Sequence, residues 1–183
     1  MNYAIRKAKL SDIPSIESLI VESVRGLTVN DYTSDQIEGA LESAWGVDTQ
    51  LISDETYFTV EDEKQLIGCG GWSYRSTLFG NDSETDRCSD ELDPENDAAK
   101  IRAFFVKPSY SRTGIGSALL NVCEKEALAK GFSKLELMAT LPGQRLYSRH
   151  GFAAGDPIEY PLNDDLKIEF VPMKKVLQGG QSI

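Results

Sequence analysis

The stretch that decides the fold is Val106-Lys107-Pro108-Ser109-Tyr110-Ser111-Arg112-Thr113-Gly114-Ile115-Gly116-Ser117. The β-rich run before it, 98–106, predicts a strand, and Pro108 ends that strand. Apolar residues at helical spacing predict a helix over 114–130. The first N–H groups of a helix lack intrahelical partners, and glycine lets a ligand approach the backbone closely. This strand–loop–helix unit therefore predicts a pyrophosphate site at the start of the helix.

The glycines exclude two better-known phosphate loops. A Walker A loop needs GxxxxGK[ST], and the dinucleotide fingerprint GxGxxG fails because Leu119 stands where the third glycine belongs. The glycines alone are equally compatible with a turn that starts a core helix. A protein that binds a nucleotide or phosphosugar through the same helix start is a further, weaker hypothesis.

Regular elements are also predicted on both sides of this unit. They are a strand at 2–8, helices at 11–26 and 34–45, a hairpin of strands 57–61 and 65–73, a polar loop at 76–97, a strand at 134–138, a helix at 143–150, and strands at 152–154 and 166–174. The order β-α-α-β-β-β-α-β-α-β-β predicts an α/β (α+β) fold, a mixed sheet with helices on both faces. We expect one domain over 1–177, with an acidic loop insertion at 74–97 and a mobile tail at 178–183.

Composition narrows the class of protein. The 183 residues are 40% hydrophobic and 26% charged, as in an ordinary globular domain. No apolar run is long enough for a membrane span, and the first residues lack the apolar stretch of a signal peptide. The three cysteines form no CxxC pair, and the single histidine excludes a histidine metal cluster. We expect a cytoplasmic protein with no metal, no membrane partner, and Cys69 and Cys123 buried as small hydrophobes.

Charge is concentrated in one segment. The net charge of −10 argues against nucleic acid as a partner, since binding nucleic acid needs a basic face. Residues 82–97 hold eight acids and one base, a charge of −7, and the rest of the chain holds 21 acids and 18 bases, a charge of −3. This acidic loop is either a solvated segment or a lid that attracts a cationic amine.

Two motifs resemble those of the GCN5-related N-acetyltransferase (GNAT) superfamily. Val-x-Pro-x-Tyr-x-x-x-Gly-Ile-Gly-Ser-Ala-Leu-Leu at 106–120 is similar to its acetyl-CoA motif, and Leu-Tyr-Ser-Arg-His-Gly-Phe at 146–152 to its Leu-Tyr-x-x-x-Gly-Phe. The resemblance implies a mostly antiparallel sheet over about residues 2–175. Ser111 stands at the usual Gln/Arg position, and Thr140 replaces an asparagine that often precedes the tyrosine helix.

The resemblance implies acetyl-CoA as cosubstrate, with no metal. The implied pyrophosphate contacts are Arg112, Thr113, Gly114, Ile115, Gly116 and Ser117. The backbone of Phe105 and Val106 is implied to hold the thioester and pantetheine. Tyr147 is implied to protonate the departing thiolate, with Ser148 as a weaker substitute, because a tyrosine is protonated at neutral pH.

Several residues are candidates for the acceptor half. Arg102 stands where many relatives carry a carboxylate, and an arginine cannot act as a base. It binds a substrate carboxylate, pairs with an acid of the loop, or is an ordinary solvent-side or ion-paired arginine. Asp97, or another acid of the loop, is a candidate base through water. Trp72, with Tyr74 and Phe104, is either part of an acceptor pocket or core. His150 is either catalytic or a surface or cap residue.

The predicted activity is transfer of an acetyl group from acetyl-CoA to a primary amine by direct attack. The acceptor is a small-molecule or peptide amine, and a homodimer is common among similar proteins. The alternative is a non-catalytic acyl-CoA sensor or interaction module on the same fold. Tyr147 favours the enzyme, because a protein that only binds has no need of a proton donor for a thiolate.

Overall fold

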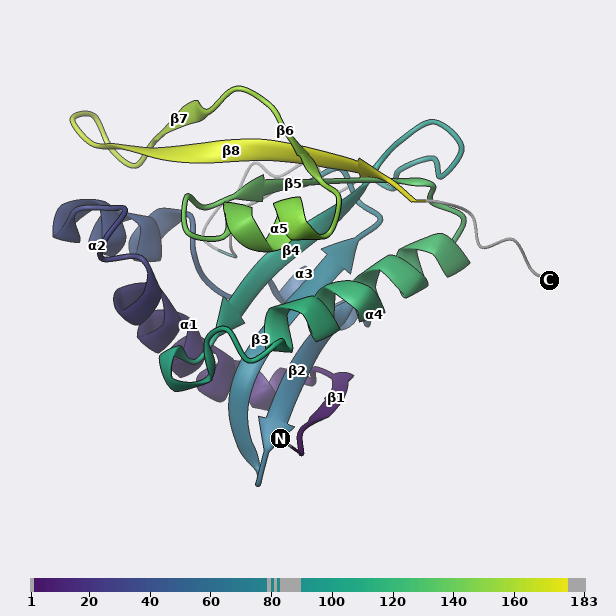
Figure 1. Ribbon diagram of the computed structural model, residues 1–183, viewed down its shortest axis with the longest axis horizontal. Coiled ribbons are helices and arrows are strands. Elements are labelled where there is room, and N and C mark those ends of the chain that lie inside the picture. Colours follow the sequence, from purple (N-terminus) through teal and green to yellow (C-terminus); the bar gives the residue numbers. More distant parts are fainter. Residues whose placement is uncertain (1, 79, 81, 83–89, 178–183) are drawn as a thin grey trace.

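The computed structural model describes residues 2–78, 80, 82 and 90–177 (Figure 1). The predicted tail at 178–183 and part of the acidic loop, 83–89, lie outside the described residues. The elements are β1 (Ala4–Lys7), α1 (Ile13–Leu27), α2 (Ser34–Ser43), α3 (Thr49–Ser53), β2 (Tyr57–Asp62), β3 (Gln65–Ser73), β4 (Ala99–Val106), α4 (Ile115–Ala129), β5 (Lys134–Ala139), α5 (Gln144–Arg149), β6 (Ala153–Ala154), β7 (Ile158–Pro161) and β8 (Lys167–Val176).

The strands form one sheet of order β1-β2-β3-β4-β5-β8-β6, and β7 pairs with β8. Only the β4–β5 pair is parallel among the described strands; the other neighbours run antiparallel. The predicted mixed, mostly antiparallel fold is therefore confirmed. Two elements were not predicted. Helix α3 has five residues, too few for a periodic pattern, and β7 is a four-residue strand of mostly exposed side chains.

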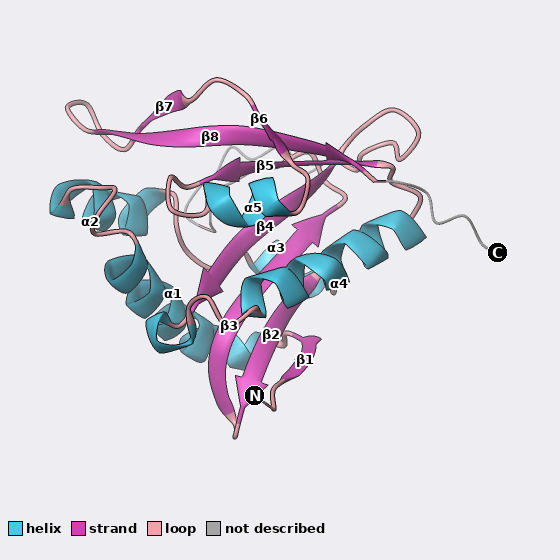
Figure 2. Ribbon diagram, viewed as in Figure 1, coloured by secondary structure: helices cyan, strands magenta, loops and turns pink. Residues whose placement is uncertain are grey.

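Helices cover both faces of the sheet, α4 and α5 on one and α1 to α3 on the other (Figure 2). Each layer has its own apolar core. Leu119, Leu120 and Cys123 of α4 belong to one core, and Ile16 and Ile20 of α1 belong to the second. Both Cys69 and Cys123 are buried, as predicted. In the part of the chain that the structure describes, no helix is both long and apolar enough to cross a membrane.

Strands β4 and β5 diverge after a short paired segment (Figure 1). They pair only at Ala99 with Leu135 and Lys100 with Glu136. Beyond this point β4 contains a bulge, where two residues oppose the single residue Gly70 of β3. The bulge residue Ala103 has a φ of 54°, and its carbonyl accepts a 2.9 Å hydrogen bond from the Tyr57 hydroxyl. The bulge bends β4 and leaves the two strands forked.

Candidate active site

A single cleft of about 1250 Å³ runs through this fork. It is lined from α1, β4, the 110–117 loop, the end of β5 and the 140–149 segment. Pockets for one drug-sized ligand usually measure roughly 300–1000 Å³. The cleft therefore has room for two ligands side by side.

At one end of the cleft, the loop before α4 has the geometry of an anion cradle. Arg112 and Gly114 have left-handed φ values of 62° and 94°. Gly114 is the residue that precedes α4, and no side chain caps the first N–H groups of the helix. A Cβ atom built on Gly114 meets nothing within 4 Å, so the backbone faces open space. Free N–H groups and the helix dipole both favour a negative charge here.

The second glycine of this loop has a different task. A Cβ atom at Gly116 would lie 3.0 Å from Cδ2 of Leu146 on α5. Gly116 does line the cleft, but its missing side chain lets α4 and α5 pack closely. Tight packing of α5 matters because the same helix carries Tyr147.

Three arginines line this end of the cleft: Arg112, Arg145 and Arg149. All three side chains are exposed, and none makes an ion pair with any residue that the structure describes. In a chain of net charge −10, a local group of unneutralised cations is unusual. Arg112 was predicted from the motif, but Arg145 and Arg149 were not. These two reach the cleft because α5 packs beside the start of α4.

Tyr147 lies against the middle of the cleft. Its ring makes edge contacts with Phe104 and Phe152, at centroid distances of 6.2 and 5.7 Å. Its hydroxyl makes no hydrogen bond to any described residue. Among the described side chains, the only polar atom that is fully buried and has no hydrogen-bond partner is Thr59 Oγ1, so the Tyr147 hydroxyl is not fully buried. The Tyr147 hydroxyl therefore keeps access to the cleft. Burial raises the pKa of Tyr147 well above its ordinary value, so the phenol holds its proton at neutral pH.

The N–H groups of the predicted backbone donors Phe105 and Val106 point in different directions. Phe105 pairs with Cys69 of β3, whereas the N–H of Val106 donates to Ser23 Oγ at 3.1 Å. Ser23 is on α1, 4% exposed, and lines the cleft. No described residue accepts a hydrogen bond from its hydroxyl. Successive N–H groups of a strand alternate in direction, so only Val106 of this pair serves the cleft.

Arg102 lines the far end of the cleft but holds a protein carboxylate. Its Nη2 atom lies 2.8 Å from Oδ2 of Asp48, and each side chain is 2% exposed. Arg102 also donates to the carbonyls of Thr77 and Gly80, at 2.8 and 3.0 Å. Arg102 is therefore an ion-paired arginine, and its carboxylate partner is Asp48. The partner precedes α3 rather than belonging to the 82–97 loop.

Two residues predicted for the acceptor half, Trp72 and Asp97, lie outside the cleft. Trp72 packs on Phe132 in the α4 core and donates from Nε1 to Glu126 at 3.1 Å. Asp97 sits in a turn before β4 and accepts the Asp93 N–H at 2.8 Å. Both faces of β3 are buried, so strand alternation could not show which face carries Trp72. Asp97 is outside the cleft because it precedes the start of β4, whereas Val106 is at its end.

The other named residues divide between cleft and surroundings. Phe104 lines the cleft; Tyr74 lies outside it, with the Lys130 ammonium 3.5 Å from its ring centroid. His150 lies within hydrogen-bond distance of Ser117, with Nε2 2.9 Å from Oγ, and so links the end of α5 to the first turn of α4. Among the described residues, no group of three His, Cys, Asp or Glu side chains could hold a metal ion.

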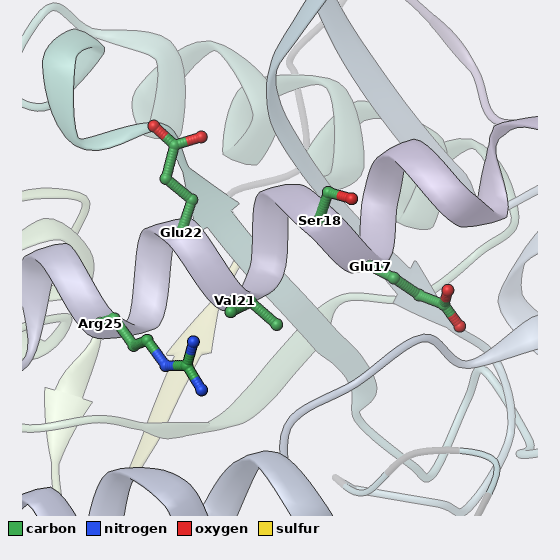
Figure 3. A pocket seen from close by; sticks show the side chains of 5 residues that line it. All are labelled: Glu17, Ser18, Val21, Glu22 and Arg25. Carbon is green, nitrogen blue, oxygen red and sulfur yellow. The ribbon is translucent and has the colours of Figure 1, made fainter.

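A second, shallow hollow lies on the outer face of α1. Figure 3 shows its five side chains: Glu17, Ser18, Val21, Glu22 and Arg25. Arg25 is paired with Glu38 of α2. None of these five residues lines the cleft in the fork, and the hollow lacks an anion cradle, so it is no competing active site.

Comparison with known proteins agrees with this geometry. The sequence matches the acetyltransferase (GNAT) family over residues 21–152, more than half of its length. The chain therefore belongs to the GNAT acetyltransferase family. A search of curated protein sequences finds no match.

Solved structures share the fold at low sequence identity. A GCN5-related N-acetyltransferase from Rhodopseudomonas palustris is 18% identical, with a TM-score of 0.71 and 97% of both chains covered. A PaiA N-acetyltransferase from Thermoplasma acidophilum, solved with coenzyme A, is 18% identical, with a TM-score of 0.64, 96% of this chain and 99% of that one covered. The ribosomal-protein-S18-alanine N-acetyltransferase of Escherichia coli is 15% identical, with a TM-score of 0.60 and coverage of 100% and 99%.

Proposed function

We propose that this protein is an N-acetyltransferase that moves an acetyl group from acetyl-CoA to a primary amine. The observation that carries the proposal is the arrangement of one cleft. An anion cradle with three unneutralised arginines forms one end, and the unpartnered hydroxyl of Tyr147 faces the middle. Membership of the GNAT family and a structural neighbour solved with coenzyme A support the choice of donor.

In this proposal the backbone of residues 112–117 binds the pyrophosphate of acetyl-CoA. Arg112, Arg145 and Arg149 neutralise the remaining phosphate charge, because a guanidinium forms strong, charge-assisted bonds to phosphate oxygens. The pantetheine arm enters the fork along β4. The thioester then lies between Val106 and Tyr147, which both line the cleft.

The chemistry is a direct transfer. The lone pair of the neutral amine attacks the thioester carbon, a C–N bond forms, and negative charge develops on the carbonyl oxygen. The Ser23 hydroxyl, whose oxygen accepts the Val106 N–H, is the proposed donor to that oxygen, and a preorganised donor stabilises such charge. The C–S bond then breaks, Tyr147 gives its proton to sulfur, and the proton lost by the amine returns to the phenolate through water.

The rival proposal, an acyl-CoA sensor without catalysis, predicts binding but no turnover. Calorimetry with acetyl-CoA, followed by thiol release with a panel of primary amines, separates the two. Binding with thiol release that depends on the amine supports the enzyme. Binding without release from any amine supports the sensor, and the absence of binding by the folded protein contradicts both.

A further inference from the structure

We infer that the acceptor is a hydrophobic amine, an apolar or aromatic body without a carboxylate and without the several charges of a polyamine. The inference rests on the proposed function and specifies its substrate. It comes from the walls of the cleft beyond Tyr147, on the side covered by α1 and α2.

Six apolar side chains line this acceptor end, together with the polar side chains of Thr28, Asn30 and Thr140. The apolar residues are Val24, Leu27, Trp45, Met138, Leu141 and Phe170. Trp45 makes ring contacts with Tyr32 and Phe170, at centroid distances of 5.8 and 6.2 Å. A surface of this kind favours an apolar body, since burying apolar area contributes roughly 25 cal/mol per Å². A charged group placed against it would lose hydration without compensation.

Among the described residues, no cation free of a protein partner lines the acceptor end. The only basic side chain there among the described residues is Arg102, which is 2% exposed and held by Asp48 and two backbone carbonyls. The other basic residues that line the cleft, Arg112, Arg145 and Arg149, belong to the donor end. A substrate carboxylate would therefore enter an apolar pocket without a counter-ion. This argues against amino acids as acceptors.

One carboxylate lines the described cleft, that of Asp31. Its side chain is exposed and makes no ion pair or hydrogen bond with any described residue. The turn that carries it is firmly held: the Asp31 N–H donates to the Thr28 carbonyl at 2.9 Å. The hydroxyl of the next residue, Tyr32, donates to the carbonyl of Glu169 and accepts the Leu141 N–H.

Among the described residues, Asp31 is the one carboxylate that offers the acceptor end an attachment point for a cation. An ammonium group pairs with this carboxylate as it enters and loses one proton to water, and the neutral nitrogen then leaves Asp31 and attacks. A polyamine such as spermidine carries three nitrogens, so with one at the thioester and one on Asp31 a third ammonium would lie against apolar side chains. The combination of one carboxylate and apolar side chains therefore disfavours polyamines.

The test is thiol release from acetyl-CoA with three acceptors of different charge: 2-phenylethylamine, phenylalanine and spermidine. We expect kcat/KM for 2-phenylethylamine to be at least about tenfold above that for the other two. Equal or faster turnover of phenylalanine or spermidine overturns the inference and leaves the proposed function standing. Acetyl-CoA binding without turnover of these or any other primary amine overturns the proposed function instead.

Asp31 is tested separately with the best acceptor of that series. Asp31→Asn should raise the KM about three- to fivefold, with kcat and acetyl-CoA affinity kept, as for loss of one exposed ion pair. Asp31→Glu should restore most of the affinity. Asp35→Asn should leave the KM unchanged, because Asp35 is an exposed residue of α2 outside the cleft. An unchanged KM in Asp31→Asn, or equal losses in Asp31→Asn and Asp35→Asn, removes Asp31 from acceptor binding.

Discussion

The hydroxyl oxygen of Ser23 accepts the N–H of Val106 at 3.1 Å, and this bond joins α1 to β4 across 83 positions of sequence. The oxygen accepts, so the hydroxyl proton is directed elsewhere, and no described residue receives it. Ser23 and Tyr147 both line the cleft. The pair therefore offers one donor, the Ser23 hydroxyl, where the thioester oxygen is proposed to lie.

Ser23→Ala should lower kcat on the order of tenfold to a hundredfold, because it removes one donor to the developing negative charge. Steady-state thiol release measures this effect, and calorimetry should show acetyl-CoA affinity changed much less. Ser18→Ala is the matched control, since Ser18 lies on the exposed face of the same helix. A kcat that stays at the wild-type value, or rises, means that Ser23 only occupies the amide and yields to substrate.

Tyr147→Phe should lower kcat by about 10²–10⁴-fold, the usual contribution of a positioned acid, while acetyl-CoA binding stays nearly intact. Burial raises the Tyr147 pKa well above its ordinary value, so the wild-type rate should show no loss of this acid as the pH rises to 10. Tyr3→Phe removes the same hydroxyl from the same core and should be silent. A Tyr147→Phe enzyme of full activity assigns protonation of the thiolate to another group.

Single alanine substitutions of Arg112, Arg145 and Arg149 should each weaken acetyl-CoA binding by about 1.5–3 kcal/mol, the value of a hydrogen bond to a charged group. The loss should shrink as salt rises, since exposed charges are screened. Calorimetry at two ionic strengths measures both effects. Arg25→Ala removes a paired arginine from outer α1 and serves as control. Binding that is insensitive to all three substitutions would contradict a phosphate role for this end of the cleft.

The pair of Arg102 and Asp48 should matter for stability because each charge is buried with the other. Arg102→Met leaves the carboxylate unpaired and should cost about 3–5 kcal/mol of unfolding free energy. The double variant with Asp48→Leu should recover part of that loss, since replacing a buried pair by apolar groups is often neutral. Urea denaturation of both variants checks this. If the single and double variants are equally unstable, the loss comes from packing rather than from an unpaired charge.

Tyr32 should make stability depend on pH in alkaline solution. Burial raises its pKa to about 12, from an ordinary value near 10. A raised folded-state pKa means that the stabilisation is fully present below pH 10 and is lost as pH rises through about 12. The difference in unfolding free energy between wild type and Tyr32→Phe should therefore be constant up to pH 10 and shrink above it. A constant difference up to pH 12 would refute the coupling.

Much of this architecture follows from local patterns in the sequence. The apolar spacing over 114–130 gives α4, and the motif at 106–120 locates the cradle. What the sequence leaves open depends on contacts between distant segments. The bulge at Ala103 shifts the alternation of β4, so spacing could not show which of Phe105 and Val106 points its N–H toward the cleft.

Three further features came only from the packing of whole elements. Ser23 looks like an ordinary residue of an amphipathic helix until α1 is placed against β4. Arg145 and Arg149 reach the donor end because Gly116 lets α5 lie close to α4. Trp72 was left open between acceptor pocket and core, and since β3 is buried on both sides, strand alternation could not decide between them.

The sheet separates two apolar cores, one under α4 and one under α1 to α3, and at the fork between β4 and β5 the cleft is lined by residues of both. Leu141 is in contact with both. Substitutions more than about 7–10 Å apart with no shared partner act additively on stability. Changes in the α1–α3 core can therefore reshape acceptor choice while the donor end keeps its geometry. In directed evolution, the two halves of this protein form separate libraries, and gains made in each should combine.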